Sequence, residues 1–359
     1  MKLLDFFTER VSRGEAMVLA TVYETLGSTY SKAGGQMLID AAGNFCGMLS
    51  GGCLEGDLVE RARRVMDSGR AETASYKLAA DDELWGLGVG CDGTMRILLQ
   101  SLTREHDYQP FAAIADSIDR GTAADVAIVI SAESPSIGVG ASLLLAPDGR
   151  QRFSMADDLA DAIELSFTAT RLAGSAELQV ADGTCTVLFA RIEPAPRLLV
   201  LGAGLDAEPL IRMACELGWR CTACDHRPAY IESRLLPAGV STVCCPADDL
   251  AQQLVLDDFD LAIVMSHHLA SDRAYLRQVA ASGIGYVGLL GPAGRRDRLM
   301  SDLGTDGEAL QGRLHGPAGI DLGGRGPAPI ALSIIAEMQR YLSQRDQPRL
   351  ATPGRQPFQ

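Results

Sequence analysis

The chain has 359 residues, of which 47% are hydrophobic and 22% charged, and its net charge is −14. The composition is that of a folded globular protein, and the length indicates two domains. The acidic balance argues against a general binder of nucleic acid or of anionic membranes, since both select basic surfaces.

No apolar stretch reaches the ~20 residues that a membrane span needs. The N-terminal segment "MKLLDFFTERVSRGEA" is interrupted at once by Asp5, and it reads as an amphipathic helix rather than a signal peptide. Nine cysteines with irregular spacing favour reduced thiols over a disulfide framework. We therefore expect a cytoplasmic protein.

The first half of the chain mixes strands with a helix. A run of apolar and β-branched residues predicts a buried strand at 16–25, and residues 34–49 read as a hairpin. Apolar residues at helical spacing follow from Leu54, and Gly69 is a plausible stop. A strand is expected again at 91–102.

A weaker echo of this pattern follows. Residues 125–153 repeat the order strand, small-residue loop, strand, and 155–167 take the place of the helix. The segment "ADGTCTVLFARI" (181–192) shares Asp-Gly-Thr before an apolar strand with "CDGTMRILLQSL". We interpret 16–102 and 125–192 as a degenerate internal duplication, and chance similarity of short strands is the alternative.

A proline-bearing linker then separates two kinds of pattern. From residue 198 on, strands alternate with helices, which predicts a doubly wound parallel sheet. The expected fold is α/β, with an N-terminal α+β lobe over 1–193 and a Rossmann-like domain over 194–345. Residues 346–359 are polar, carry Pro and Gly, and are expected to be disordered.

The Rossmann-like half opens with a dinucleotide-type motif, "VLGAGLDAEPL". Gly202 fits the tight turn, Gly204 the close approach of a pyrophosphate, and Ala207 the third small position. Asp225 lies 21 residues beyond Gly204, where an acid binds ribose hydroxyls. The motif predicts NAD(P) or another nucleotide, and the alternative is a tight strand–helix turn without cofactor.

A glycine turn before the first predicted helix carries a thiol and an acid, in "MLSGGCLEGD" (48–57). Gly51 and Gly52 free backbone N–H groups at a helix N-terminus, which is an anion-binding arrangement. The same positive end favours the thiolate of Cys53, as a nucleophile or a soft-metal ligand. Glu55 suits the helix dipole and repels a phosphate, which favours thiol, metal or proton-transfer chemistry. A buried, unreactive cysteine is the alternative.

Two further motifs are candidates. In "LWGLGVGCDGT" (84–94), the glycines, Gly90 among them, suggest close approach of a flat ligand beside Trp85, and Cys91 ends the run. In "MSHHLASD" (265–272), His267 follows a parallel strand, where ligands of such sheets gather, and could act in proton transfer or binding. A helix-capping histidine is the alternative.

Four other cysteines are left without a role: Cys221, Cys224, Cys244 and Cys245. The "CTAC" spacing resembles a redox motif. On a strand, however, an offset of three places the two thiols on opposite faces.

These motifs in this order resemble the XdhC/CoxI family, the xanthine dehydrogenase accessory factors. The resemblance spans residues 5–343 and rests mainly on "LGSTYSKAGGQML", "GMLSGGCLEGD", "LWGLGVGCDGT", "PRLLVLGAG", "YVGLLG" and "GIDLGGRGPAPIALSIIAEM". The sequence departs from the family pattern at Tyr30, Ser31 and Gln36, and by His267-His268 in place of His-x-His. It also has "GRGPAP" in place of an Arg-Thr-Pro-x-Glu pattern.

The resemblance implies a chaperone for the molybdenum cofactor, which holds it during sulfuration and helps to insert it into an apo molybdenum hydroxylase. A cysteine desulfurase would be the second partner, and a homodimer is expected. Cys53 and Cys91 would lie beside the pterin, as soft ligands of molybdenum or guards of its sulfur, and Glu55 could carry a proton. The form of the cofactor, molybdopterin or its cytosine dinucleotide, is left open.

Two rival functions belong to other classes. The first is an NAD(P)-dependent oxidoreductase that uses the Rossmann lobe with His267. The second is a scaffold that only docks partners. The leading interpretation is a maturation factor rather than an enzyme that turns over a metabolite.

Overall fold

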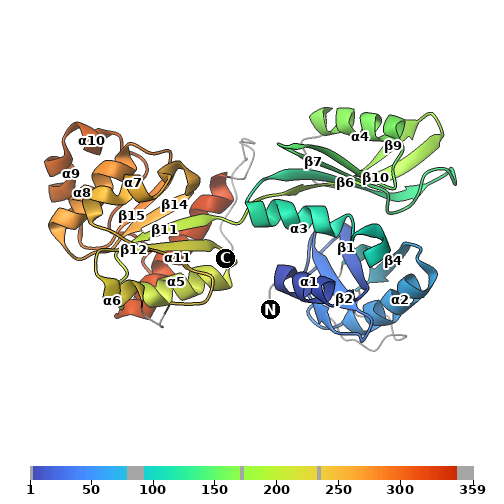
Figure 1. The fold of residues 1–359 in the computed structure, drawn as a ribbon, viewed down its shortest axis with the longest axis horizontal. Coiled ribbons are helices and arrows are strands. Elements are labelled where there is room, and N and C mark those ends of the chain that lie inside the picture. Colours follow the sequence, from blue (N-terminus) through green and yellow to red (C-terminus); the bar gives the residue numbers. More distant parts are fainter. Residues whose placement is uncertain (1–2, 79–92, 170–173, 233–235, 346–359) are drawn as a thin grey trace. The chain divides into compact units, whose positions relative to one another are not determined.

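The computed structural model describes residues 3–78, 93–169, 174–232 and 236–345. The chain divides into two compact units, an N-terminal unit over Met1–Pro194 and a C-terminal unit over Ala195–Gln359. The division falls in the proline-bearing linker, one residue beyond the expected boundary. Figure 1 shows the helices and strands of each unit.

The N-terminal unit repeats one arrangement twice. Its two antiparallel sheets have the strand orders β3-β2-β1-β5-β4 and β8-β7-β6-β10-β9, which are the same connectivity. In each half one long helix, α2 or α4, lies between the third and fourth strands. This shared strand order is what the duplication interpreted from 16–102 and 125–192 would leave.

The elements of this unit follow in chain order: α1 Leu3–Ser12, β1 Met17–Leu26, β2 Gln36–Asp40, β3 Phe45–Cys46, α2 Glu55–Ser68, β4 Glu72–Lys77, β5 Thr94–Leu102, α3 Phe111–Arg120, β6 Ala124–Ala132, β7 Ser142–Ala146, β8 Gly149–Phe153, α4 Asp157–Ala169, β9 Gly174–Val180 and β10 Gly183–Ile192.

Both faces of the first sheet are buried, and this explains the continuous apolar run of β1. Met17 and Leu19 face a core shared with α1, α3 and the second sheet, whereas Val18 and Ala20 face α2. Helix α2 buries Leu54, Leu58, Ala62 and Val65 against this second face, at the spacing that predicted the helix. Packing of α2 onto the sheet therefore fixes where its N-terminal loop lies.

The C-terminal unit is a parallel sheet of order β13-β12-β11-β14-β15-β16, which is the Rossmann strand order. Helices α5 and α11 cover one face, and α7, α8 and α9 cover the other (Figure 1). The order reverses between β11 and β14, so a crevice opens at their carboxyl ends.

The elements of this unit are β11 Arg197–Leu201, α5 Ala207–Glu216, β12 Arg220–Asp225, α6 Pro228–Ile231, β13 Ser241–Cys244, α7 Leu250–Gln253, β14 Leu261–Val264, α8 Leu269–Ala280, β15 Tyr286–Leu289, α9 Ala293–Leu303, α10 Thr305–Glu308, β16 Leu314–His315 and α11 Pro327–Arg345.

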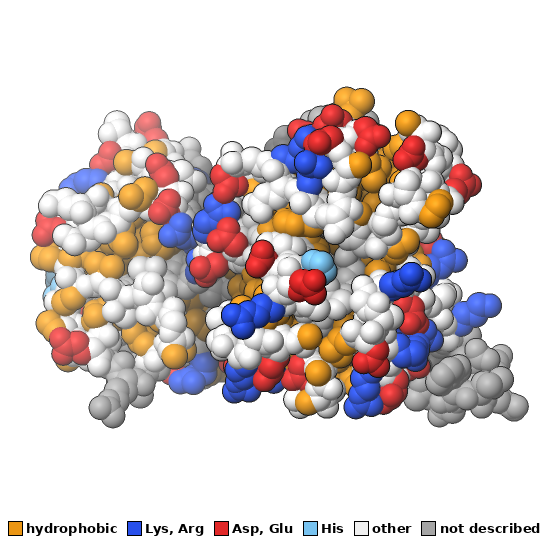
Figure 2. All heavy atoms as spheres, turned by 45° about the vertical axis from the view of Figure 1, so that its right-hand side comes forward, with side chains coloured by type: hydrophobic (Ala, Val, Ile, Leu, Met, Phe, Trp, Pro, Cys, Tyr) orange, Lys and Arg blue, Asp and Glu red, His pale blue; other side chains and the backbone are white. Residues whose placement is uncertain are grey.

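Two surface properties bear on function. On the face drawn in Figure 2, Lys and Arg side chains are interspersed with Asp and Glu rather than gathered in one patch. Across the described ranges, no helix combines the length and the apolar character that crossing a membrane requires.

Candidate functional site

The glycine loop before α2 is organised by a carboxylate of its own chain. Glu55 is only 3% exposed, and its Oε1 accepts hydrogen bonds from the N–H groups of Leu49 (3.1 Å) and Ser50 (3.0 Å). Its Oε2 accepts from the N–H groups of Gly52 (3.0 Å) and Leu54 (3.1 Å), and from the Ser50 hydroxyl (2.6 Å). Four backbone donors and one hydroxyl therefore converge on a single side chain.

These contacts change the roles expected for the loop. Burial disfavours the charged form of Glu55, but donation by Ser50 and the backbone outweighs burial and places its pKa below the ordinary value of 4.5. The anion that the loop binds is thus Glu55 itself, which occupies the N–H groups of Leu49, Ser50, Gly52 and Leu54. As a tightly held carboxylate, Glu55 shapes the loop, and carrying a proton would require breaking these bonds.

The loop presents Cys53 as a free, partly exposed thiol just before the helix begins. Gly51 and Gly52 have φ values of 78° and 112°, a backbone region that side chains rarely adopt. A Cβ on Gly51 would lie 3.6 Å from the ring of Tyr30, which is 64% exposed. The neighbourhood of Cys53 therefore combines open backbone with an accessible aromatic ring.

The second candidate cysteine cannot be placed beside the first. Cys91 and Gly90 lie outside the described residues, and so does Trp85. The segment that holds them is flanked by Leu78 and Gly93, which are joined by a backbone hydrogen bond of 2.8 Å. A Cβ on Gly93 would clash with Ser28 and Thr29. The Gly93 flank thus lies beside Ser28 and Thr29, in the segment after β1.

In the C-terminal unit, the first glycine of the dinucleotide motif serves the fold. Gly202 has a φ of 107°, and a Cβ there would lie 2.7 Å from backbone atoms of Met265 and Ser266, at the end of β14. Ala207 is fully buried between α5 and the sheet, as its small size predicted. A Cβ on Gly204 would instead meet the carboxylate of Asp206, at 2.8 Å.

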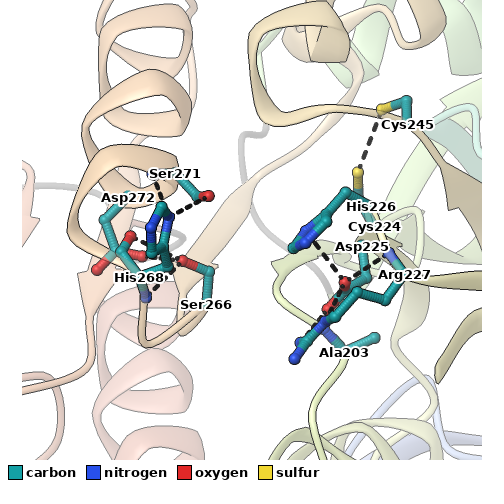
Figure 3. Close-up of polar contacts among 10 residues, drawn as sticks. All are labelled: Ala203, Cys224, Asp225, His226, Arg227, Cys245, Ser266, His268, Ser271 and Asp272. Carbon is teal, nitrogen blue, oxygen red and sulfur yellow. Dashed lines mark hydrogen bonds and ion pairs between the residues drawn. The ribbon is translucent and has the colours of Figure 1, made fainter.

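Asp225, the expected ribose anchor, is closed by its own neighbours (Figure 3). It is 1% exposed, and its Oδ2 accepts from the Ala203 N–H (2.9 Å) and from Nη2 of Arg227 (2.8 Å). Its Oδ1 accepts from the N–H (3.0 Å) and Nε (2.9 Å) of Arg227. Burial raises the pKa of this carboxyl, but the contacts with Arg227 and the Ala203 N–H together outweigh burial, so the net shift of the pKa is downward. Ribose hydroxyls would have to displace an internal ion pair.

Two histidines after β14 have different partners. His267 Nε2 lies 2.6 Å from Oδ2 of Asp206, in the turn before α5. His267 adopts a φ of 59°, a left-handed conformation that costs a non-glycine residue about 1 kcal/mol and recurs at functional sites. The capping role considered for His267 falls instead to His268, whose ring accepts from the Ser271 N–H (Figure 3).

A cavity of about 560 Å³ lies beside His267, at the carboxyl ends of the strands. Its walls come from α5, from the segments after β14, β15 and β16, and from the start of α11. Arg295 enters it and is held by Asp272, whose Oδ2 accepts from Nε (3.0 Å) and Nη2 (2.5 Å). Asp272 is 1% exposed and also accepts from Ser266. Sequence reasoning missed Asp206, although it stands within "VLGAGLDAEPL", because only the small residues of that motif were assigned roles. It missed Arg295 because that residue stands in no recognised motif.

The structure shows the surroundings of three of the cysteines that were left without a role. Cys221 and Cys224 face the two different cores of the sheet, as their spacing predicted. Cys224 instead meets Cys245, with 3.5 Å between the sulfur atoms (Figure 3). Burial raises the pKa of both thiols, which keeps them protonated and unreactive. Among the described residues, no three His, Cys, Asp or Glu side chains gather in the way a protein metal site requires.

The geometry yields a prediction about dinucleotides. Because Asp225 is closed and Asp206 places a negative charge at the start of α5, we expect no saturable binding of NADH or NADPH at up to about 1 mM by calorimetry. Arg227→Ala, which opens Asp225, serves as the comparison. Tight binding to wild type that Gly204→Val abolishes would contradict the expectation and restore the usual Rossmann mode.

Comparisons with known proteins agree with the two-unit fold. Residues 11–77 match the XdhC and CoxI family, and residues 198–338 match the XdhC Rossmann domain. A protein of Bacillus subtilis, named as a probable subunit of xanthine dehydrogenase, is 32% identical over 325 residues, which are 90% of this chain and 92% of that protein. The molybdenum cofactor insertion chaperone PaoD of Escherichia coli is 23% identical over 341 residues, 94% of this chain and 86% of that protein.

A solved structure supports the same relationship. A crystal structure described as a xanthine dehydrogenase from Bacillus halodurans superposes with a TM-score of 0.79 and 27% identity, covering 98% of each chain. Both units therefore have counterparts in one related protein, in the same order. On its sequence matches and its fold, the chain belongs to the XdhC/CoxI family.

Proposed function

We propose that this protein is a chaperone of the molybdenum cofactor, which protects the cofactor during sulfuration and assists its insertion into a xanthine dehydrogenase-type hydroxylase. The observation that carries the proposal is the match, over nearly the whole chain, to a relative named as a molybdenum cofactor insertion chaperone. The proposal describes binding and transfer, not turnover of a metabolite.

The glycine loop supports a role in holding this cargo. Cys53 offers a soft thiol, the ligand type that suits sulfur-bound transition metals. Glu55 fixes the loop through five hydrogen bonds, so the thiol is held on a preorganised backbone. In this proposal Cys53 lies at the molybdenum end of the cargo. Because four of the loop N–H groups already bind Glu55, we do not assign the cofactor phosphate to them. Cys91 remains the second proposed thiol.

The proposed partners follow from the cargo. An apo molybdenum hydroxylase would receive it, and a cysteine desulfurase would supply the sulfur. The eight described cysteines form no disulfide with one another, and a reducing cytoplasm is the proposed place of work. A homodimer is part of the proposal, and light scattering on the purified protein tests it.

The test is equilibrium binding of isolated molybdenum cofactor to the purified full-length protein, followed by transfer to an apo-hydroxylase. We expect Cys53→Ala to weaken cofactor retention roughly 10-fold or more. Loss of a direct metal ligand should reduce affinity at least as much as loss of a group that only orients a ligand. Cys244→Ala, which removes an exposed thiol in the other unit, is the matched control. Equal retention by wild type and both variants would refute the role of Cys53, and absence of binding to wild type would refute the chaperone.

A further inference from the structure

The cavity of the C-terminal unit has the dimensions of a small-molecule site. Its volume of about 560 Å³ lies within the 300–1,000 Å³ typical of ligand pockets. It lies at the topological switch of a parallel sheet, where ligands of this architecture bind. Its walls are mostly apolar, from Leu210, Met265, Leu290, Pro292, Pro317, Ala318, Pro327, Ile330, Ala331 and Ile334. Such walls favour a flat, uncharged body.

Three polar side chains project into this apolar cavity, and they are oriented by contacts of their own. Oδ2 of Asp206 lies 2.6 Å from Nε2 of His267, within hydrogen-bond distance. Within the described part of the chain, its Oδ1 makes no hydrogen bond. Arg295 donates hydrogen bonds from Nε and Nη2 to the buried Asp272, and its Nη1 remains available to a ligand. The cavity thus offers a carboxylate acceptor and a guanidinium donor in fixed positions.

The charge balance of these groups excludes a strongly anionic ligand. Asp206 is paired with His267 and Arg295 with Asp272, so the cavity carries no surplus positive charge. Asp206 also stands at the first turn of α5, where a Rossmann pyrophosphate would bind, and it would repel one. A neutral ring with hydrogen-bonding edges fits this balance.

One ring edge complements both free groups. Two adjacent N–H donors pair with a carboxylate, and a neighbouring ring carbonyl accepts from a guanidinium, as guanine O6 does from arginine. The 2-amino-pyrimidin-4-one edge has this sequence of donor, donor and acceptor, and pterins and guanine share it. We propose that the cavity binds this edge, with Asp206 accepting from the ring N–H and the adjacent amino group and Arg295 donating to the carbonyl.

The inference deepens the proposed function, because the cargo proposed above carries a pterin. It rests on that function only for the biological source of the ring, since recognition is argued from the cavity. It assigns the pterin ring to the cavity of the C-terminal unit.

The test uses purified full-length protein and the fluorescence of 6-hydroxymethylpterin. We expect saturable quenching on binding, competition by guanosine, and no competition by adenosine, which lacks the carbonyl, the ring N–H and the 2-amino group of this edge. If 6-hydroxymethylpterin binds more tightly than guanosine competes, the natural ligand is the pterin ring of the cofactor. If guanosine binds more tightly, the natural ligand is a guanine nucleotide. Failure of both rings to bind would overturn the proposal.

Variants locate the site. Asp206→Asn should weaken pterin binding roughly 10-fold to 100-fold, because it replaces a charged acceptor pair by an amide. Glu208→Gln, on the outer part of the same helix beside Arg212, is the matched control and should bind as wild type. Ile330→Phe enlarges a side chain in the cavity wall and leaves Asp206 in place. Because Ile330 is 42% exposed, the larger ring should narrow the cavity without disturbing the core. Unchanged binding in both Asp206→Asn and Ile330→Phe would overturn the assignment.

Binding of intact molybdenum cofactor separates this inference from the proposed function. Cys53→Ala should lose intact cofactor but keep 6-hydroxymethylpterin. If wild type binds intact cofactor but neither ring, the chaperone stands and the cavity assignment fails. If it binds the ring through Asp206 but not the cofactor, the cavity assignment stands and the chaperone fails.

Discussion

Glu55→Ala should destabilise the N-terminal unit by about 3 kcal/mol, because it leaves several buried donors without an acceptor. The four backbone N–H groups of Leu49, Ser50, Gly52 and Leu54 lie at the loop before α2 and all bind this one carboxylate. Thermal or denaturant unfolding, followed by circular dichroism, measures the loss. A loss below about 0.5 kcal/mol would show that the loop does not depend on Glu55.

Two further variants isolate the charge. Glu60→Gln, which removes an exposed acid from the same helix, should leave stability within about 0.5 kcal/mol of wild type. Glu55→Gln keeps the shape but replaces one accepting oxygen by an N–H₂ group, so we expect an intermediate loss. If Glu55→Gln were as stable as wild type, the carboxylate charge would contribute nothing.

The same site predicts a pH dependence. The pKa of Glu55 is lower in the folded protein than its ordinary value of 4.5, so the unfolded chain binds this proton more readily. The stabilisation by Glu55 is therefore complete above about pH 4.5 and is lost as the pH falls through the folded pKa. The free energy of unfolding of wild type should exceed that of Glu55→Gln by an amount that shrinks as the pH falls from 6 to about 3. A difference that is constant over this range would contradict the assignment.

Gly202→Ala is the second large expected effect, in the C-terminal unit. Its φ of 107° is strained for alanine, and the added Cβ would lie 2.7 Å from the backbone of Met265 and Ser266. Strain and overpacking together should cost roughly 2–5 kcal/mol of unfolding free energy. The effect arises without any ligand, because the clash is with the chain itself.

A matched glycine separates the two contributions. Gly218 in the same unit has a φ of 85°, and a Cβ there would meet nothing within 4 Å. Gly218→Ala should therefore cost only the conformational strain, about 1 kcal/mol. Chemical denaturation of the two variants gives the difference that is due to packing. Equal losses would mean that the turn relaxes and that Gly202 is not required by the close approach of β14.

Much of the fold could be predicted from local patterns. The helical spacing from Leu54 to Val65 predicts α2, because its buried face is the one the sequence marks. Alternation of strands and helices after the linker predicts the parallel sheet, since each short apolar strand needs a crossover helix. The two cysteines of "CTAC", Cys221 and Cys224, lie on opposite faces of the sheet, as the two-residue period of a strand predicts.

The candidate sites were predictable only as positions along the chain. The motif "SGGCLEGD" indicates a glycine turn with a thiol, but Glu55 gains its role from donors that the folded loop turns toward it. Asp225 stands where an acid binds ribose, yet Arg227 occupies both of its oxygens. A motif fixes residue types and spacing, whereas the folded chain decides which partner reaches a group first.

The strand–helix order could thus be predicted from the amino-acid sequence alone, because it depends on periodicity and on neighbours along the chain. The family was indicated by the resemblance of the motifs to those of known members. Tertiary structure was needed to show that Asp206 meets His267, that Arg295 is held by Asp272, and that Cys224 lies beside Cys245. Each pair joins residues between 21 and 61 positions apart. Such contacts exist only once the sheet has brought the ends of its strands together, and no local pattern records them.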